Sequence, residues 1–192
     1  LDSKLGTEAE FKNMIKQCNA VGVDIIADVV LNQTTGADVA DGKQTGVAGT
    51  EYNGSTGDYP GFATEQYPEG ITASDFHSCS KNISNYANQQ EVQECRLSSM
   101  WDFDSESEKV QDIQSDYLAA LWNAGVRGFR MDAVKHIHTD SMRAIKEKFA
   151  KKIGVNADSI YWIQEVIGTS SEAAGIQPSN YVQNGTVTEF GF

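Results

Sequence analysis

Four acidic residues lie at corresponding places in the sequence, each near the carboxyl end of a stretch that is typical of a β-strand. They are Asp28, Asp132, Glu165 and Glu189. The first of these stretches, residues 23–30, is nearly all apolar, as in parallel strands buried on both faces. Because the carboxyl ends of parallel strands meet at one edge of a sheet, we expect the four acids to converge in one cavity. A single strand-end acid can equally be solvated or cap the next helix, but four in register favour a shared site.

Two of these acids have neighbours that suit opposite chemical tasks. Arg130 precedes Asp132 by two positions, so both side chains point to one face of a strand, and the guanidinium favours the ionised carboxylate that a nucleophile needs. Glu165 lies between the apolar pairs 162–163 and 166–167, surroundings that favour a protonated general acid. Two carboxylates adjusted in opposite directions are typical of glycoside hydrolysis.

Helices and strands that would position these acids alternate along the chain. Apolar residues recur at helical spacing after Thr7 and up to Gly22, again up to Gly125, and again up to Gly154. The predicted strands are residues 23–30, 126–133, 160–167 and 186–190. From Leu31 to about Asp104 the pattern dissolves into a long segment rich in Gly, Asn, Ser and Thr. The order predicts an α/β fold with a parallel sheet, because parallel neighbours need crossover connections.

Composition excludes several classes of function. The chain has 192 residues, with 15 basic and 27 acidic side chains and a formal net charge of −12. Such a balance argues against binding to nucleic acid or to an anionic membrane surface. No apolar run approaches the roughly 20 residues of a membrane-spanning helix. The length also falls short of the ~250 residues of a complete eight-unit β/α barrel, so we expect a fragment.

Three ordered motifs resemble the signatures of the α-amylase family of retaining glycoside hydrolases. Residues 28–33, Asp-Val-Val-Leu-Asn-Gln, are similar to the family's Asp-Val-Val-x-Asn-His, and residues 128–136, Gly-Phe-Arg-Met-Asp-Ala-Val-Lys-His, are similar to its second signature. Residues 164–167, Gln-Glu-Val-Ile, are similar to the third, and residues 100–103 occupy the place of an extra signature near the end of an inserted domain. The resemblance covers the whole chain and is strongest to secreted animal-type and actinomycete-type enzymes.

This resemblance implies a partial (β/α)8 TIM barrel with a loop-rich β domain inserted after the third strand. The chain would hold about strands 3 to 6. Residues 1–32 and 102–192 would belong to the catalytic barrel, and residues 33–101 would form a calcium-binding domain B. The early strands and the family's third catalytic carboxylate, the Asp of its last signature, are expected outside the chain.

The activity implied by the resemblance is retaining endo-hydrolysis of α-1,4-glucosidic bonds in starch, glycogen and maltooligosaccharides by a secreted monomer. Asp132 would be the nucleophile, Glu165 the general acid/base, and Arg130 the partner that orients Asp132. The implied substrate-binding residues are Asp28, Gln33, Lys135, His136 and Ile167. Gln33 replaces the signature His, and because its shape and reach differ we expect altered substrate binding with the reaction type preserved.

Ions are also implied. The side chains of Asn32 and Asp102 and the carbonyls of Gln93 and His136 would hold a structural calcium ion that ties the insert to the barrel. Ligation by oxygen alone suits Ca²⁺. In related enzymes the residue matching Arg130 can also help to hold chloride. His77 and His138 are expected at the surface or in a supporting role.

The three cysteines indicate whether the protein is made for an oxidising compartment. Cys79 and Cys95 lie in a polar, loop-like stretch, and in a secreted protein they would form a disulfide that contributes about 3 kcal/mol. Cys18 is either a small buried apolar residue or half of a disulfide whose partner lies outside the chain.

Alternatives to an α-amylase stay open at this point. An α-glucosidase or a transglycosylase can be built on the same scaffold. A non-catalytic homologue that binds glycans or serves as a partner subunit is a third alternative, but it predicts loss of Asp132 and Glu165, which are both present.

Overall fold

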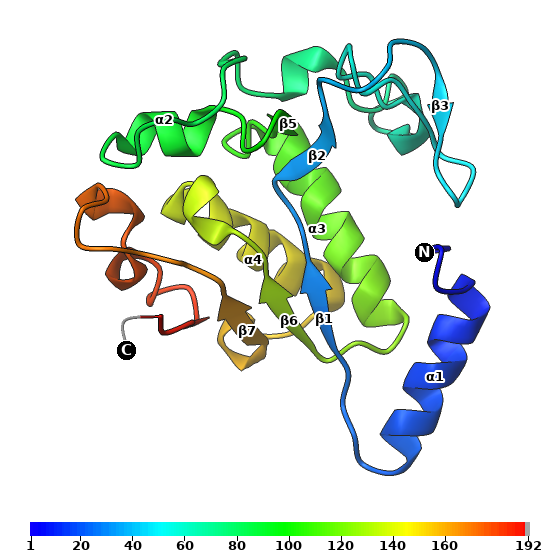
Figure 1. Ribbon diagram of the computed structural model, residues 1–192. Helices are drawn as coiled ribbons and strands as arrows, with labels where there is room; N and C mark the ends of the chain where they lie inside the picture. The colour runs from blue at the N-terminus through cyan, green and yellow to red at the C-terminus, as the bar shows by residue number, and fades with distance from the viewer. Residues whose placement is uncertain (191–192) are drawn as a thin grey trace.

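A four-stranded parallel sheet runs through the lower half of the structure, a computed structural model described for residues 1–190 (Figure 1). Its strands, in spatial order, are β1 (Ile26–Val29), β6 (Gly128–Met131), β7 (Tyr161–Gln164) and β8 (Thr186–Val187). Every pairing in the sheet is parallel. The predicted α/β class with a parallel sheet is therefore confirmed.

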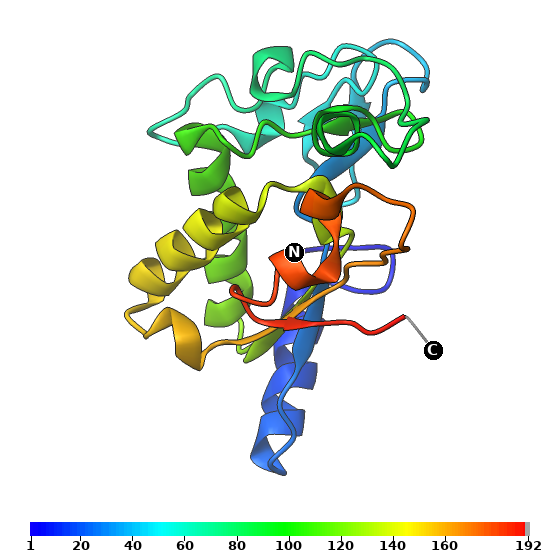
Figure 2. The same cartoon turned by 90° about the vertical axis from the view of Figure 1, so that its left-hand side faces the viewer.

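Helices α1 (Glu8–Ala20), α3 (Glu108–Asn123) and α4 (Thr139–Ile153) complete the alternating pattern. Thr7 and Glu10 form the capping box that starts α1: the Thr7 Oγ1 accepts from the Glu10 amide, and the Glu10 carboxylate accepts from the Thr7 amide. Gly154, with φ of +71°, ends α4 in the left-handed conformation that glycine tolerates best. Helices α3 and α4 pack side by side against one face of the sheet (Figures 1 and 2).

Aromatic rings fill the space between the sheet and these two helices. Phe129 of β6 packs edge-to-face against Phe149 of α4, with ring centroids 5.3 Å apart, and against Trp162 of β7 at 6.1 Å. Phe129 and Phe149 are completely buried, and Trp162 is 2% exposed. Edge-to-face contacts at such distances add to the free energy gained by burying the rings. The sheet that carries the strand-end acids therefore rests on a buried, closely packed aromatic core.

Strand β1 forms an open edge of the sheet. It pairs only with β6 in the described part of the chain, and Ile26 and Val30 are 46% and 53% exposed. The expectation that residues 23–30 are buried on both faces is therefore wrong for this structure. Ile26, Asp28 and Val30 alternate with the buried Val29, so they share one face of β1, and within residues 1–190 that face is open to solvent.

The long segment between β1 and α3 forms a separate layer above the carboxyl ends of the strands (Figures 1 and 2). Its regular elements are β2 (Gln33–Gly36), β3 (Gln44–Thr45), β4 (Glu51–Tyr52), α2 (Gln89–Glu94) and β5 (Met100–Asp102). Strand β2 pairs with β5 and β3 with β4, both antiparallel.

Single 3₁₀ turns, labelled η1 to η6, occur in the insert and in the rest of the described chain, at Pro60–Phe62, Ala73–Asp75, Val134–His136, Ala157–Ser159, Ala174–Ile176 and Pro178–Asn180.

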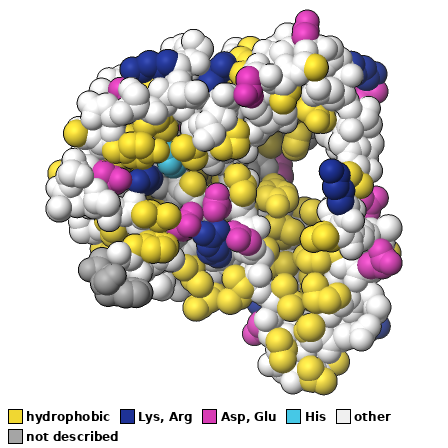
Figure 3. Space-filling view, in the orientation of Figure 1, with side chains coloured by type: hydrophobic (Ala, Val, Ile, Leu, Met, Phe, Trp, Pro, Cys, Tyr) yellow, Lys and Arg dark blue, Asp and Glu magenta, His cyan; other side chains and the backbone are white. Residues whose placement is uncertain are grey.

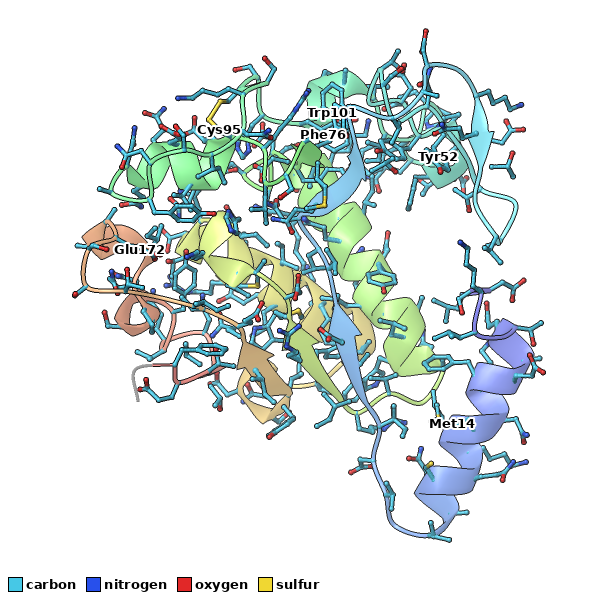
Figure 4. All side chains as sticks on the ribbon, viewed as in Figure 1. Met14, Tyr52, Phe76, Cys95, Trp101 and Glu172 are labelled. Atoms are coloured by element: carbon cyan, nitrogen blue, oxygen red, sulfur yellow. A yellow bond between two sulfur atoms is a disulfide. The ribbon has the colours of Figure 1, made fainter. Side chains whose placement is uncertain are left out.

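This layer, which we call the insert, has its own small aromatic core. Tyr59, Ile71 and Phe76 are buried, and Phe76 packs against Trp101 with ring centroids 5.1 Å apart (Figure 4). A disulfide joins Cys79 to Cys95 with an S–S distance of 2.07 Å, as predicted, whereas Cys18 is free. The boundaries 1–32, 33–101 and 102–192 stay a prediction. No helix in residues 1–190 is long and apolar enough to cross a membrane.

Candidate active site

Three strand-end acids converge on a single guanidinium at the carboxyl edge of the sheet. Arg130 Nη1 donates to Asp28 Oδ1 at 2.6 Å and to Asp132 Oδ1 at 2.8 Å, and Arg130 Nη2 pairs with Glu165 Oε1 at 2.7 Å. The register explains this meeting, because Arg130 lies beside Asp28 of β1 on one side and beside Ile163 of β7 on the other. The predicted convergence is thus confirmed for three of the four acids, while Glu189 lies two residues beyond β8.

Charge at this site is unbalanced. Hydrogen bonds to Asp28 and Asp132 raise the pKa of Arg130 above its usual range, so the guanidinium stays charged. One cation then faces three carboxylates that are between 17% and 66% exposed. A surplus of negative charge at a water-accessible edge stabilises positive charge that develops on a bound substrate. On the face seen in Figure 3, a basic side chain is flanked by acidic ones within a largely apolar surround.

Glu165 differs from its predicted setting. Its second oxygen, Oε2, accepts a hydrogen bond of 3.0 Å from the amide of Ala133, so both carboxylate oxygens contact donors. Val166 is buried, but Ile167 is 46% exposed. The apolar surroundings expected of Glu165 are therefore incomplete, because its carboxylate contacts the Arg130 guanidinium and the Ala133 amide. Its role as general acid/base stays a prediction.

A strained turn after β6 supplies that amide. Ala133 has φ of +49°, a left-handed conformation that costs a residue with a side chain roughly 1–2 kcal/mol. Two hydrogen bonds fix the turn to β7: the Val134 amide donates to the Glu165 carbonyl, and the Glu165 amide donates to the Met131 carbonyl, each at 2.9 Å. Strain held in place by its surroundings is common at functional sites.

Lys135 and His136, which the family resemblance implies as substrate contacts, are buried. Lys135 Nζ donates to the Ile167 carbonyl at 2.7 Å and pairs with Glu172 at 3.1 Å, so it fastens the segment after β7. The His136 ring contacts the Val92 carbonyl of α2 at 2.9 Å, and burial lowers the pKa of His136 to about 4. Glu172 was missed at the sequence level because a lone acid in an irregular segment carries no periodic signal.

The Gln33 side chain lines a cavity and has no hydrogen-bond partner among the described residues. Its side chain is 9% exposed, and neither amide atom has a hydrogen-bond partner. The cavity has a volume of about 410 Å³ and is lined by the rings of Tyr52, Tyr59 and Phe103, among others. A contact between Gln33 and the substrate stays a prediction.

Three of the four residues expected to hold calcium, Asn32, Asp102 and His136, are in contact at the junction of sheet and insert. Asn32 Nδ2 is 2.5 Å from Asp102 Oδ1 and 3.2 Å from the His136 carbonyl, while Asn32 Oδ1 is buried without a partner. The two ends of an amide have the same shape, and the opposite orientation would bring three oxygens together. Gln93 follows Val92, the residue whose carbonyl holds His136. The orphaned amide oxygen and the oxygen-rich donor set fit Ca²⁺.

His77 supports this junction. Its Nδ1 lies 2.7 Å from Asp102 Oδ2, and its Nε2 lies 3.2 Å from Glu106 Oε2. Burial lowers the pKa of His77, but hydrogen bonds to Asp102 and Glu106 more than offset it and raise the pKa to about 10. Burial also raises the pKa of Asp102 to about 6, against the opposing effect of His77 and Asn32.

Comparison with known proteins decides the family. The family model "Alpha amylase, catalytic domain" matches residues 1–174. The chain belongs to the α-amylase family. It is 35% identical to an α-amylase of Streptomyces violaceus over 97% of this chain and 29% of that protein, and 34% identical to one of Pecten maximus over 100% of this chain and 37% of that protein. The chain thus spans about a third of the length of these curated relatives.

Solved α-amylases have the same fold as this chain. α-Amylase I from Eisenia fetida superposes with a TM-score of 0.84 and 34% identity, over 99% of this chain and 38% of that one. A glutamate-to-glutamine variant of the same enzyme, solved as a maltohexaose complex, gives a TM-score of 0.85. The prediction of a partial β/α barrel is confirmed by this match and by the parallel sheet with its helices.

Proposed function

We propose that this chain supplies the nucleophile and the general acid/base of an α-amylase that cuts internal α-1,4-glucosidic bonds of starch and glycogen with retention. The observation that carries the proposal is the convergence of Asp132 and Glu165, from neighbouring strands, on Arg130. Retaining glycosidases use two carboxyl groups close together, one as nucleophile and one as acid and base. The barrel units outside this third of the relatives' length would supply the remaining active-site groups.

In the first displacement, Asp132 Oδ would attack the anomeric carbon while Glu165 protonates the departing glycosidic oxygen. In the second, ionised Glu165 would take a proton from water, which attacks the covalent intermediate. The contacts of Glu165 with Arg130 and the Ala133 amide suit the second step, in which the carboxylate acts as a base. We infer that substrate loosens the Arg130–Glu165 contact, so that Glu165 can carry a proton in the first step.

Two of the proposed substrate contacts are open to solvent. The Asp28 side chain is 66% exposed beside Asp132, and Ile167 is 46% exposed. Lys135 and His136 are buried with their polar side-chain atoms engaged. We propose that Lys135 and His136 act indirectly. Through the Ile167 carbonyl and α2 they would hold in place the surface that the sugar chain contacts on the leaving-group side.

Product analysis of the full-length polypeptide tests this function. Proton NMR during maltooligosaccharide hydrolysis should show the α-anomer forming first, and starch digestion should release mixed short oligosaccharides. First formation of the β-anomer would contradict a retaining mechanism. Release of glucose alone would indicate an α-glucosidase, and sugar-to-sugar transfer in place of hydrolysis would indicate a transglycosylase.

We further propose that Asn32, Asp102 and the carbonyls of Gln93 and His136 hold a Ca²⁺ ion, which would supply a structural link between insert and barrel. Chelation should lower the melting temperature by about 5–10 °C, because an ion at 100 times its Kd adds about 2.7 kcal/mol and a domain of this size shifts about 2–4 °C per kcal/mol. Asn32→Ala should show the lower melting temperature with or without chelator. A melting temperature that chelator leaves unchanged in the unaltered protein would contradict the site.

Chloride fits this arrangement poorly. An anion beside Arg130 would meet the three carboxylates that already contact both Nη atoms. The proposed mechanism therefore has no step that involves chloride.

The Cys79–Cys95 disulfide supports the proposal that the protein is secreted, since such bonds persist in oxidising compartments. A polysaccharide substrate, a monomeric state and the absence of nucleic-acid or membrane partners complete the proposal.

A further inference from the structure

Two histidines and two carboxylates meet where the insert approaches the start of α4. His77, Asp104 and Glu106 come from the insert, the last two from its final residues between β5 and α3, and His138 directly precedes α4. The four side chains line a hollow of about 630 Å³. They lie on three separate stretches of the chain, so only the tertiary fold brings them together.

Their ligand atoms lie close enough together to share one metal ion. His77 Nε2 lies 3.2 Å from Glu106 Oε2 and 3.8 Å from Asp104 Oδ1, and one ligand atom from each of these residues falls within 4.8 Å of the others. An ion with metal–ligand bonds of about 2.0–2.1 Å separates its tetrahedral ligands by roughly 3.4 Å. His138 Nε2 lies 2.9 Å from the other oxygen of Glu106, within reach of a fourth position.

A buried carboxylate orients the histidine toward this point. Asp102, 2% exposed, contacts His77 Nδ1 at 2.7 Å, which leaves Nε2 facing Asp104 and Glu106. The Nδ1 proton stays with the contact to Asp102, and a bound metal ion would displace the proton from Nε2, since metal binding to histidine releases a proton. Carboxylate–histidine–metal arrangements of this kind fix the ring and raise its basicity as a ligand.

We propose that His77, Asp104, Glu106 and His138 form a binding site for a first-row transition-metal ion such as Zn²⁺. Two imidazoles and two carboxylates suit Zn²⁺, which takes four nitrogen, sulfur or oxygen ligands. Calcium is disfavoured here because it takes six to eight oxygens. A bound ion links His77 of the insert to His138 at the start of α4. The site is independent of the proposed glycosidase activity. It adjoins the oxygen-only group around Asn32, because Asp102 faces Asn32 with Oδ1 and His77 with Oδ2, but none of its four ligands belongs to that group.

Titration calorimetry of the chain with ZnCl₂, in excess Ca²⁺ to fill oxygen-only sites, tests this proposal. We expect one Zn²⁺ per chain and a Kd at least tenfold weaker in His77→Gln and in Glu106→Gln, because losing even an outer partner of a zinc ligand costs about 10–100-fold. Asp140→Asn is the matched control. Asp140 lines the same hollow, its side chain is 90% exposed, and it pairs with Arg143 instead of the cluster.

Cobalt provides a readout of the ligands themselves. Co²⁺ in the proposed site should give the visible absorption of a four-coordinate ion, and Glu106→Gln should reduce that band while the far-ultraviolet circular dichroism stays unchanged. If His77→Gln does not fold, Glu106→Gln alone carries the test, because the Glu106 side chain is 41% exposed. Three results would overturn the proposal and leave an ion-pair network only. They are no Zn²⁺ binding by the unaltered chain, unchanged Zn²⁺ binding by Glu106→Gln, and loss of Zn²⁺ binding in excess Ca²⁺.

Discussion

Replacing Asp132 by Asn in the full-length polypeptide should abolish starch hydrolysis, lowering kcat by roughly 10⁴-fold or more, as removal of a catalytic nucleophile does. The amide keeps the shape of the side chain but cannot form the covalent glycosyl ester. It also removes one of the charges that Arg130 Nη1 holds at 2.8 Å. Reducing-sugar release from soluble starch measures the loss directly.

The matched control for this variant is Asp140→Asn, an identical chemical change on an exposed side chain outside the sheet edge. It should keep kcat within about twofold. Circular dichroism and melting temperature should agree between the two variants and the unaltered protein, because Asp132 is not part of the aromatic core. Hydrolysis by Asp132→Asn within tenfold of the unaltered rate would remove Asp132 from the nucleophile position.

Replacing Glu165 by Gln should lower the rate on starch by about 10²–10⁴-fold, the usual contribution of a general acid or base. The loss in the first displacement should nearly vanish for an aryl maltooligoside with an acidic phenol, because such a leaving group departs without a proton. A burst of phenol followed by slow turnover is therefore expected, since the second displacement still needs a base.

The substrate contrast separates the roles of the two carboxylates. Asp132→Asn should lose activity on starch and on the aryl substrate alike. Glu165→Gln should lose activity on starch but keep the burst of phenol from the aryl substrate. Stopped-flow absorbance of the released phenol distinguishes these cases. Equal losses on both substrates in Glu165→Gln, without a burst, would show that Glu165 does not protonate the leaving group.

Sequence alone predicted the parts of this site that follow from strand order. Parallel strands place their carboxyl ends together, so the meeting of Asp28, Asp132 and Glu165 follows from three apolar stretches and one acid at the end of each. The i, i+2 spacing of Arg130 and Asp132 predicted their shared face, and the 2.8 Å contact agrees. The disulfide followed from two cysteines in one polar loop.

The features that were missed depend on contacts between distant segments. The donors around Glu165 come from β6 and the turn after it, which no local pattern near residue 165 reveals. His77 meets Asp102 and Glu106 across the chain, and Glu172 meets Lys135 in the same way. The burial of residues 23–30 on both faces was misjudged, because an apolar stretch shows that a strand can be buried and not whether the elements that would cover it are present.

The most direct test of the central claim is to identify the residue that carries the sugar. Glu165→Gln in the full-length polypeptide, mixed with an α-maltosyl fluoride, should accumulate the covalent intermediate, because fluoride leaves without a proton and the step that needs a base is slowed. Peptide mass spectrometry should then find the added sugar on Asp132. Sugar attached to Asp28 or another residue, or turnover with inversion and no adduct, would contradict the account.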